Sequence, residues 1–281
     1  MKVGLIQMHC THDQKDNVRQ AIKAIREVAA QGAQIVCLPE LFTSPYFCQT
    51  RDDRFFSLAE SIPGPTTEMF SLLAKELKIV LILSLFEKGP KGNYYNTTAV
   101  VDPAGNLLGT YRKMHIPHDP SNGYDETYYF TPGDLGFQSF QTPFGKIAPM
   151  VCWDQWYPEG ARINAAQGAQ ILFYPTAIGW PIDSMSARVE VNAAEHAAWQ
   201  IIQQSHSIAN NVFVVAVNRV GPQDGIHFWG TSFVSDPYGR ILAKGGTERP
   251  ENFVVECDLS LIDSMRKEWP FLECRRVHVE A

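Results

Sequence analysis

The feature that most constrains the fold of this chain is an internal repeat. The segment Gln31-Gly32-Ala33-Gln34-Ile35 returns as Gln167-Gly168-Ala169-Gln170-Ile171, 136 residues later. The turn sequence Asp102-Pro103-x-Gly105 returns as Asp236-Pro237-x-Gly239, at an offset of 134 residues. Turn sequences alone recur in many α/β proteins, but the five-residue match favours duplication. The sequence therefore predicts two similar halves, at about residues 1–143 and 144–281.

Within the first half, β-rich runs alternate with helical patterns. Val3–Met8 and Ile35–Leu38 are typical of buried strands, and apolar residues recur at helical spacing between residues 17 and 32. A second helix is predicted from about Thr66 to Leu77, followed by a strand over Ile79–Leu85. A half of this kind covers one face of its sheet with helices and leaves the other face to pack elsewhere.

Two such sheets packed face to face, with helices outside, make a four-layer αββα sandwich. The predicted fold class is therefore α/β. No glycine-rich linker or shift in composition separates the halves. We expect them to share one core in a single domain over residues 1–281.

Composition and charge exclude several classes of function. The 24 basic and 30 acidic residues give a net charge of −6 without a basic block, so neither nucleic acid nor an anionic membrane is an expected partner. No apolar run approaches the roughly 20 residues of a membrane-spanning helix, and no signal-peptide core follows Met1. We therefore expect a cytoplasmic protein whose six cysteines are reduced.

Motifs for cofactors and metals are absent from the sequence. It contains no glycine-rich nucleotide-binding motif and no paired C-x-x-C. His115 and His118, beside Asp119, form the nearest approach to a metal motif. Two loop histidines without further ligands are more often structural, so we expect neither metal nor cofactor.

Three candidate reactive residues lie where predicted strands end. Glu40 follows the strand Ile35–Leu38, and a carboxylate there is costly unless it is solvated, paired or functional. Cys152 lies at a strand-to-helix elbow, where backbone amides and the helix dipole favour a thiolate. Lys113 follows the strand Leu107–Tyr111. Each has an ordinary interpretation alone: a loop acid, a small buried side chain and a solvated charge.

Together these three residue types form a coherent chemical set. A cysteine nucleophile needs a group that takes its proton, and a carboxylate in a partly desolvated pocket can do so. A nearby ammonium group can stabilise the oxyanion as it develops. The set suits hydrolysis of a C–N bond through an enzyme thioester.

The segments around these residues resemble the signatures of the nitrilase superfamily of carbon-nitrogen hydrolases. The resemblance rests on Leu38-Pro39-Glu40, on Tyr111-Arg112-Lys113 with His115, and on Val151-Cys152-Trp153-Asp154. It implies an αββα sandwich with a Glu–Lys–Cys triad. In that triad Glu40 is the general base, Lys113 stabilises the oxyanion and Cys152 is the nucleophile.

Further segments are similar to one group of the superfamily, the N-carbamoylputrescine amidases. They include Tyr46-Phe47-Cys48-Gln49 and Trp153-Asp154-Gln155-Trp156. The resemblance implies hydrolysis of N-carbamoylputrescine to putrescine, ammonia and carbon dioxide, in polyamine synthesis, without a cofactor. It also implies a homodimer or larger homo-oligomer, and it makes Glu126 a second active-site glutamate. Thr127, where the group's pattern has a lysine, and residues 180–191 depart from the group.

Recognition of a cationic chain calls for aromatic faces and a carboxylate. The candidates for binding the substrate are Tyr46, Trp153, Trp156 and Trp180 for the wall, and Asp125, Asp154 or Glu190 for the ammonium group. Three alternatives stay open: another carbamoyl amidase acting on N-carbamoyl-β-alanine or N-carbamoyl amino acids, an ω-amidase or nitrilase, and a catalytically silent scaffold of the same fold.

Overall fold

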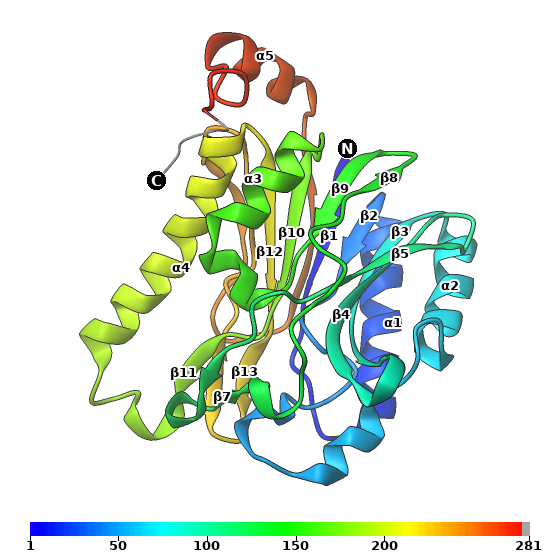
Figure 1. The fold of residues 1–281 in the computed structure, drawn as a ribbon, viewed down its shortest axis with the longest axis vertical. Helices are drawn as coiled ribbons and strands as arrows, with labels where there is room; N and C mark the ends of the chain where they lie inside the picture. The colour runs from blue at the N-terminus through cyan, green and yellow to red at the C-terminus, as the bar shows by residue number, and fades with distance from the viewer. Residues whose placement is uncertain (277–281) are drawn as a thin grey trace.

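The computed structural model describes residues 1–276, and its main strands form two six-stranded sheets in the middle of the molecule (Figure 1). The first sheet has the order β17-β1-β2-β3-β4-β5, with β17 at Glu251–Glu256, β1 at Lys2–Gln7, β2 at Ile35–Cys37, β3 at Val80–Lys88, β4 at Tyr94–Val101 and β5 at Leu107–Arg112. The second has the order β16-β15-β12-β10-β9-β8, with β16 at Ile241–Lys244, β15 at Phe233–Ser235, β12 at Phe213–Asn218, β10 at Ile171–Thr176, β9 at Gly145–Pro149 and β8 at Phe140–Thr142.

Strand order and register correspond between the two sheets. Val3 of β1 pairs with Ile35 of β2, and Ile147 of β9 pairs with Ile171 of β10, so the repeated glutamine-rich segments enter equivalent strands in the same register. The next pairs, β2–β3 and β10–β12, are parallel in both sheets. The repeat seen in the sequence is therefore a repeat of sheet topology.

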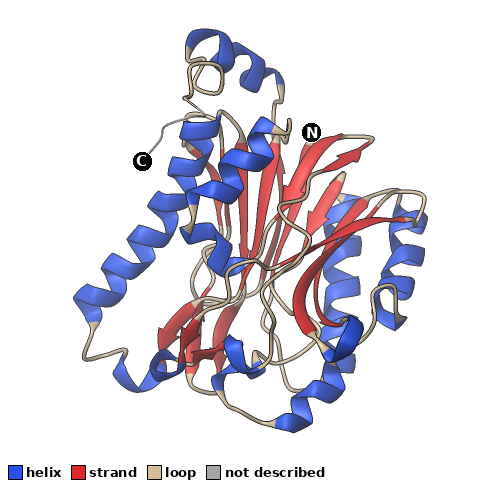
Figure 2. Cartoon of the chain, in the orientation of Figure 1, coloured by secondary structure: helices blue, strands red, loops and turns tan. Residues whose placement is uncertain are grey.

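Helices cover the outer face of each sheet, as Figure 2 shows. They are α1 at Gln14–Ala30 and α2 at Pro65–Leu77 on the first sheet, and α3 at Pro158–Ala166 and α4 at Val189–Asn210 on the second. Between the sheets, Leu5 and Ile82 belong to one apolar cluster with Phe173 and Val215. The predicted αββα sandwich is confirmed. The prediction of one domain over 1–281 includes residues 277–281, which lie outside the described residues.

Local sequence explains where individual elements begin and turn. Helix α1 begins at Gln14, earlier than the apolar pattern predicts, because the Asp13 side chain accepts hydrogen bonds from the first backbone amides of the helix. The two repeated turns are also alike. Asp102 and Asp236 each accept backbone amides within their own turn, which closes at a glycine with φ of 86° at Gly105 and 77° at Gly239.

Short elements close the two ends of the sandwich. At one end α5, at Ser260–Glu268, contributes Ile262 to the cluster between the sheets. At the other end lie the small sheets (Figure 1), which comprise β6 at His118–Asp119, β7 at Tyr124–Asp125, β11 at Gly179–Pro181, β13 at Val220–Gln223 and β14 at Ile226–Trp229. The Tyr124 hydroxyl accepts the amide of Gly179 at 2.9 Å and joins β7 to β11.

Candidate active site

The three predicted reactive residues come together in one buried cluster. Glu40 follows β2, Lys113 directly follows β5, and Cys152 follows β9 at the start of a short 3₁₀ helix, Cys152–Trp156. Glu40 and Lys113 are completely buried, and Cys152 is 3% exposed. The charges of Glu40 and Lys113 both act on the Cys152 thiol. Strand ends from both sheets therefore supply the cluster.

Lys113 is the centre of this cluster. Its Nζ donates to Oε1 of Glu40 at 2.8 Å and to both carboxylate oxygens of Glu126, at 2.8 and 2.7 Å. Burial acts to lower the pKa of Lys113, but the charges of Glu126 and Glu40 outweigh it and hold the pKa well above its usual value. The side chain therefore carries a fixed positive charge.

The two oxygens of the Glu40 carboxylate differ in their surroundings. Oε1 accepts from Lys113 and from Nδ2 of Asn96, the latter at 2.7 Å. Oε2 is buried and has no hydrogen-bond partner among residues 1–276. One oxygen is thus held in place while the other remains available to accept a proton, which is the arrangement that a general base requires.

Glu126, in the 3₁₀ helix Glu126–Tyr128, is also completely buried. Burial raises the pKa of its carboxyl group to about 7, against the opposing effect of Lys113. Tyr46, predicted to line the substrate wall, instead donates its hydroxyl to Oε1 of Glu126 at 2.7 Å. The Tyr46 ring is completely buried, and its hydroxyl holds the Glu126 carboxylate in place.

The turn at Cys152 has a strained backbone. Cys152 has φ of 41°, in the left-handed region, which non-glycine residues enter at an energetic cost. Asp154 supports the turn: its Oδ2 accepts the amide of Val151 at 3.0 Å, and its Oδ1 accepts Nδ1 of His115 at 2.7 Å. Because its carboxylate is buried and occupied, Asp154 is not free to bind a substrate ammonium.

The electrostatics of Cys152 correct one expectation. The sequence predicts a thiolate stabilised by backbone amides and a helix dipole. In the structure, burial and the Glu40 carboxylate raise the pKa of the Cys152 thiol well above its usual value, and Lys113 only partly opposes them. The resting side chain is therefore a neutral thiol.

A cavity of about 240 Å³ lies beside Trp153, the residue that follows Cys152. Its lining consists of Asp119, Asn122, Tyr124, Trp153, Trp156, Ile178, Gly179, Pro181, Arg188, Glu195, Ala198 and Trp229. The predicted wall residues Trp153 and Trp156 line it. Trp180 does not; its indole donates to the carbonyl of Asn192 at 3.1 Å, and its ring packs on Trp229. The cavity lining thus combines aromatic residues, including Trp153 next to Cys152, with a group of charged residues.

The other predicted ammonium partners lie elsewhere. The Asp125 carboxylate is 2.5 Å from Nε of Arg51 and 3.1 Å from Nδ1 of His118, and it does not line the cavity. Glu190 is exposed on the first turn of α4 and also lies outside the lining. The acids that do line the cavity, Asp119 and Glu195, are not among the predicted partners.

A buried arginine completes the site and was also missed. Arg219 is 1% exposed, and its guanidinium donates to the carbonyls of Glu40, Leu41 and Ser44 at 3.0, 2.7 and 3.1 Å. It follows β12 of the second sheet, yet it holds the turn after β2 of the first. The signal was present in the sequence, since a charge after the apolar strand Phe213–Asn218 is as unusual as Glu40 after its own strand.

Comparison with known proteins now decides the family. The family model described as carbon-nitrogen hydrolase matches residues 2–267. The chain belongs to this family. The predicted membership of the nitrilase superfamily is confirmed, and this carbon-nitrogen hydrolase is an enzyme that acts on C–N bonds.

Relatives of this carbon-nitrogen hydrolase are amidases with different substrates. It is 41% identical to the N-carbamoylputrescine amidase of Solanum lycopersicum, over 98% of this chain and 91% of the relative. It is 36% identical to a citrullinase of Francisella tularensis, over 98% and 95%. A carbon-nitrogen hydrolase from Helicobacter pylori G27, of solved structure, has a TM-score of 0.93 at 40% identity, covering 99% of this chain and 96% of that chain.

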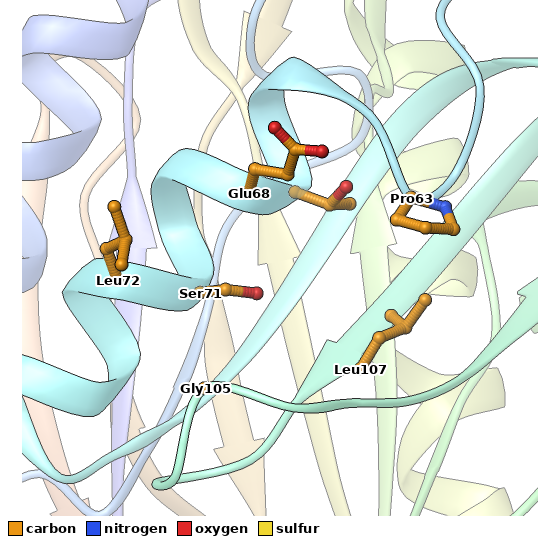
Figure 3. Close-up of a pocket in the computed structure, with 7 residues that line it drawn as sticks. Pro63, Glu68, Ser71, Leu72, Gly105 and Leu107 are labelled. Carbon is orange, nitrogen blue, oxygen red and sulfur yellow. The ribbon is translucent and has the colours of Figure 1, made fainter.

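A second hollow, of about 380 Å³, lies between α2 and the turn before β5, where Figure 3 shows Glu68, Ser71 and Leu72 on the helix with Pro63 and Leu107 nearby. Neither this hollow nor the 240 Å³ cavity has a residue of the Lys113 cluster in its lining, but the 240 Å³ cavity is lined by Trp153, which is next to Cys152. Within residues 1–276, no group of three or more His, Cys, Asp or Glu side chains is placed to hold a metal ion, and no helix has the length and apolar character to cross a membrane.

Proposed function

We propose that this enzyme hydrolyses the terminal carbamoyl group of N-carbamoylputrescine and so supplies putrescine for polyamine synthesis. The observation that carries this choice is the charge of the cavity lining. Two carboxylates, Asp119 and Glu195, and one guanidinium, Arg188, leave one uncompensated negative charge beside an aromatic wall. N-carbamoylputrescine brings one ammonium group on an apolar four-carbon chain, which matches both features.

The buried cluster supports a covalent mechanism. Sγ of Cys152 attacks the carbamoyl carbon while its proton passes to Oε2 of Glu40, and the oxyanion develops beside Nζ of Lys113. The bond between the carbamoyl carbon and the terminal NH2 group then breaks. This NH2 group takes the proton from Glu40 and leaves as ammonia. The remaining carbamoyl group is held on sulfur as a thioester-type intermediate.

The second half of the reaction uses the same base. Glu40 takes a proton from water, the resulting hydroxide attacks the carbamoyl carbon, and the C–S bond breaks as the thiol is re-protonated. The released carbamic acid loses carbon dioxide and leaves the free amine. Because Cys152 rests as a thiol, Glu40 is needed in both halves.

One relative points to a second candidate substrate. Citrulline carries the same ureido group, but its far end has both an ammonium and a carboxylate group. Arg188 in the lining favours this alternative, since a guanidinium binds a carboxylate through two parallel hydrogen bonds. The two substrates therefore differ only in the carboxylate that citrulline carries beside its ammonium group, and this carboxylate would meet the charged residues of the cavity.

The test is a substrate panel on the purified enzyme. We expect kcat/KM for N-carbamoylputrescine to exceed that for citrulline, for N-carbamoyl-β-alanine and for dicarboxylate monoamides, with ammonia release as the common readout. A higher value for any of the carboxylate-bearing compounds would contradict the proposed substrate and assign the enzyme to another amidase activity.

A further inference from the structure

The charged side of the cavity contains an ion pair with an unusual position. Nη2 of Arg188 lies 2.8 Å from Oε1 of Glu195, and both residues line the cavity. Arg188 is the residue directly before α4, where a positive charge opposes the helix dipole. Helix stability therefore does not explain an arginine here. Its partner lies seven residues further on, two turns along the same face of the helix.

The third charged residue of the lining has partners of its own. Asp119 accepts hydrogen bonds from Ser121 and from Asn122, both at 2.7 Å. Burial acts to raise the pKa of Asp119, but these hydrogen bonds lower it below its usual value. The charge of Arg188 acts in the same direction. Asp119 is thus ionised and held in place without a direct ion pair to Arg188 among the described residues.

The two carboxylates therefore have different states. The charge of Glu195 is used to neutralise Arg188, whereas that of Asp119 remains available to a ligand. A cation at the far end of the cavity meets Asp119 and leaves the Arg188–Glu195 pair intact. A carboxylate at the same end needs Arg188, and it has to displace Glu195 first.

We infer that Glu195 masks Arg188 and thereby makes the cavity select a terminal ammonium group over an α-amino acid end. This inference rests on the proposed function, because it explains how the same site rejects citrulline. Selectivity arises from the cost of breaking the Arg188–Glu195 pair, which is added only when the substrate carries a carboxylate. The masked arginine also gives a direct route by which one substitution converts the specificity.

The experiment compares kcat/KM for citrulline with kcat/KM for N-carbamoylputrescine in four proteins. Glu195→Gln keeps the size of the side chain and exposes Arg188, so the ratio should rise by about threefold to fivefold, the effect of removing one partly exposed ion pair. The double variant Glu195→Gln/Arg188→Gln should lose that gain. Glu76→Gln is the matched control: it removes the same charge from another exposed Arg–Glu pair, with Arg26, and should leave the ratio at the wild-type value.

The outcomes separate this inference from the proposed function. Wild-type enzyme that prefers citrulline would overturn the proposed function. Wild-type enzyme that prefers N-carbamoylputrescine, with an unchanged ratio in Glu195→Gln, would overturn the masking of Arg188 alone. A gain that persists in the double variant would also overturn it, because Arg188 would not be its cause. Thermal unfolding of each variant shows that the comparison is made between folded proteins.

Discussion

The buried cluster and the charged rim of the cavity each pair a cation with a carboxylate, but in opposite surroundings. In the cluster, Lys113 lies between Glu40 and Glu126, and all three side chains are completely buried. At the rim, Arg188 pairs with Glu195, and their side chains are 31% and 43% exposed. Water screens the rim but not the cluster. The difference teaches that the charges of the cluster interact strongly because they are buried, whereas the charges of the rim form a contact that a single substitution can change at little cost in stability.

The largest effect is expected at the nucleophile. Cys152→Ala removes the attacking sulfur, so kcat should fall by roughly 10⁴-fold or more, as for other essential nucleophiles. The exposed Cys274 provides the control, and Cys274→Ala should retain wild-type turnover. Ammonia release measures both. Turnover by the Cys152→Ala variant well above a protein-free blank would rule out the covalent mechanism.

Replacing Lys113 in the buried cluster or Arg188 at the rim tests the comparison between the two regions directly. Lys113→Met leaves two buried carboxylates uncompensated, and the free energy of unfolding should fall by about 3–5 kcal/mol. Arg188→Met breaks a screened pair, and the change should stay below about 1 kcal/mol. Urea unfolding followed by circular dichroism measures both. Equal losses in the two variants would mean that burial does not separate the two regions.

Arg219 should link stability to activity. Arg219→Met removes the donor to the carbonyls of Glu40 and Ser44, and each buried acceptor that loses its partner costs about 1–3 kcal/mol. Because the Glu40 turn is then released, we expect kcat to fall by about 10- to 100-fold with a smaller change in KM. Arg19→Met, on the exposed face of α1, is the control. An unchanged kcat would show that Arg219 stabilises the fold without positioning the base.

The smallest effect concerns pH. The carboxyl pKa of Glu126 is raised to about 7, so protonation sets in as the pH falls towards and below neutrality. Protonation removes a negative charge beside Lys113, and kcat/KM should therefore decline below about pH 7. In Glu126→Gln this limb of the profile should flatten. A limb that is unchanged in the variant would belong to another group.

Much of the architecture could be predicted from the sequence because the internal repeat corresponds to a repeat of strand order. The five-residue match that ends at Ile35 and Ile171 identified equivalent strands. The apolar runs identified the strands whose side chains form the core between the sheets. Glu40, Lys113 and Cys152 were candidates because each follows a predicted strand, and the resemblance of the surrounding segments to the nitrilase signatures is what singled them out. Their roles in the reaction, and the expected homo-oligomer, stay predictions.

The rim could not be predicted, for a physical reason. Asp119 and Glu195 lie 76 positions apart in the sequence, and only the folded structure brings both into the lining of one cavity. Tyr46 was assigned to the wall because aromatic residues bind cations. The sequence does not show which way the Tyr46 hydroxyl points. In the structure it points to the Glu126 carboxylate and donates a hydrogen bond to it.

The pairing of β17 with β1 has a consequence for biosynthesis. The first sheet, built mainly from the beginning of the chain, is completed at its edge by Glu251–Glu256, and the Glu40 turn is held by Arg219. A ribosome releases these segments last. The nascent chain can form its first helices early, but the Glu40 turn gains its contacts with Arg219 only after residue 219 has been made. The first sheet is therefore completed only when most of the second half of the chain has been synthesised.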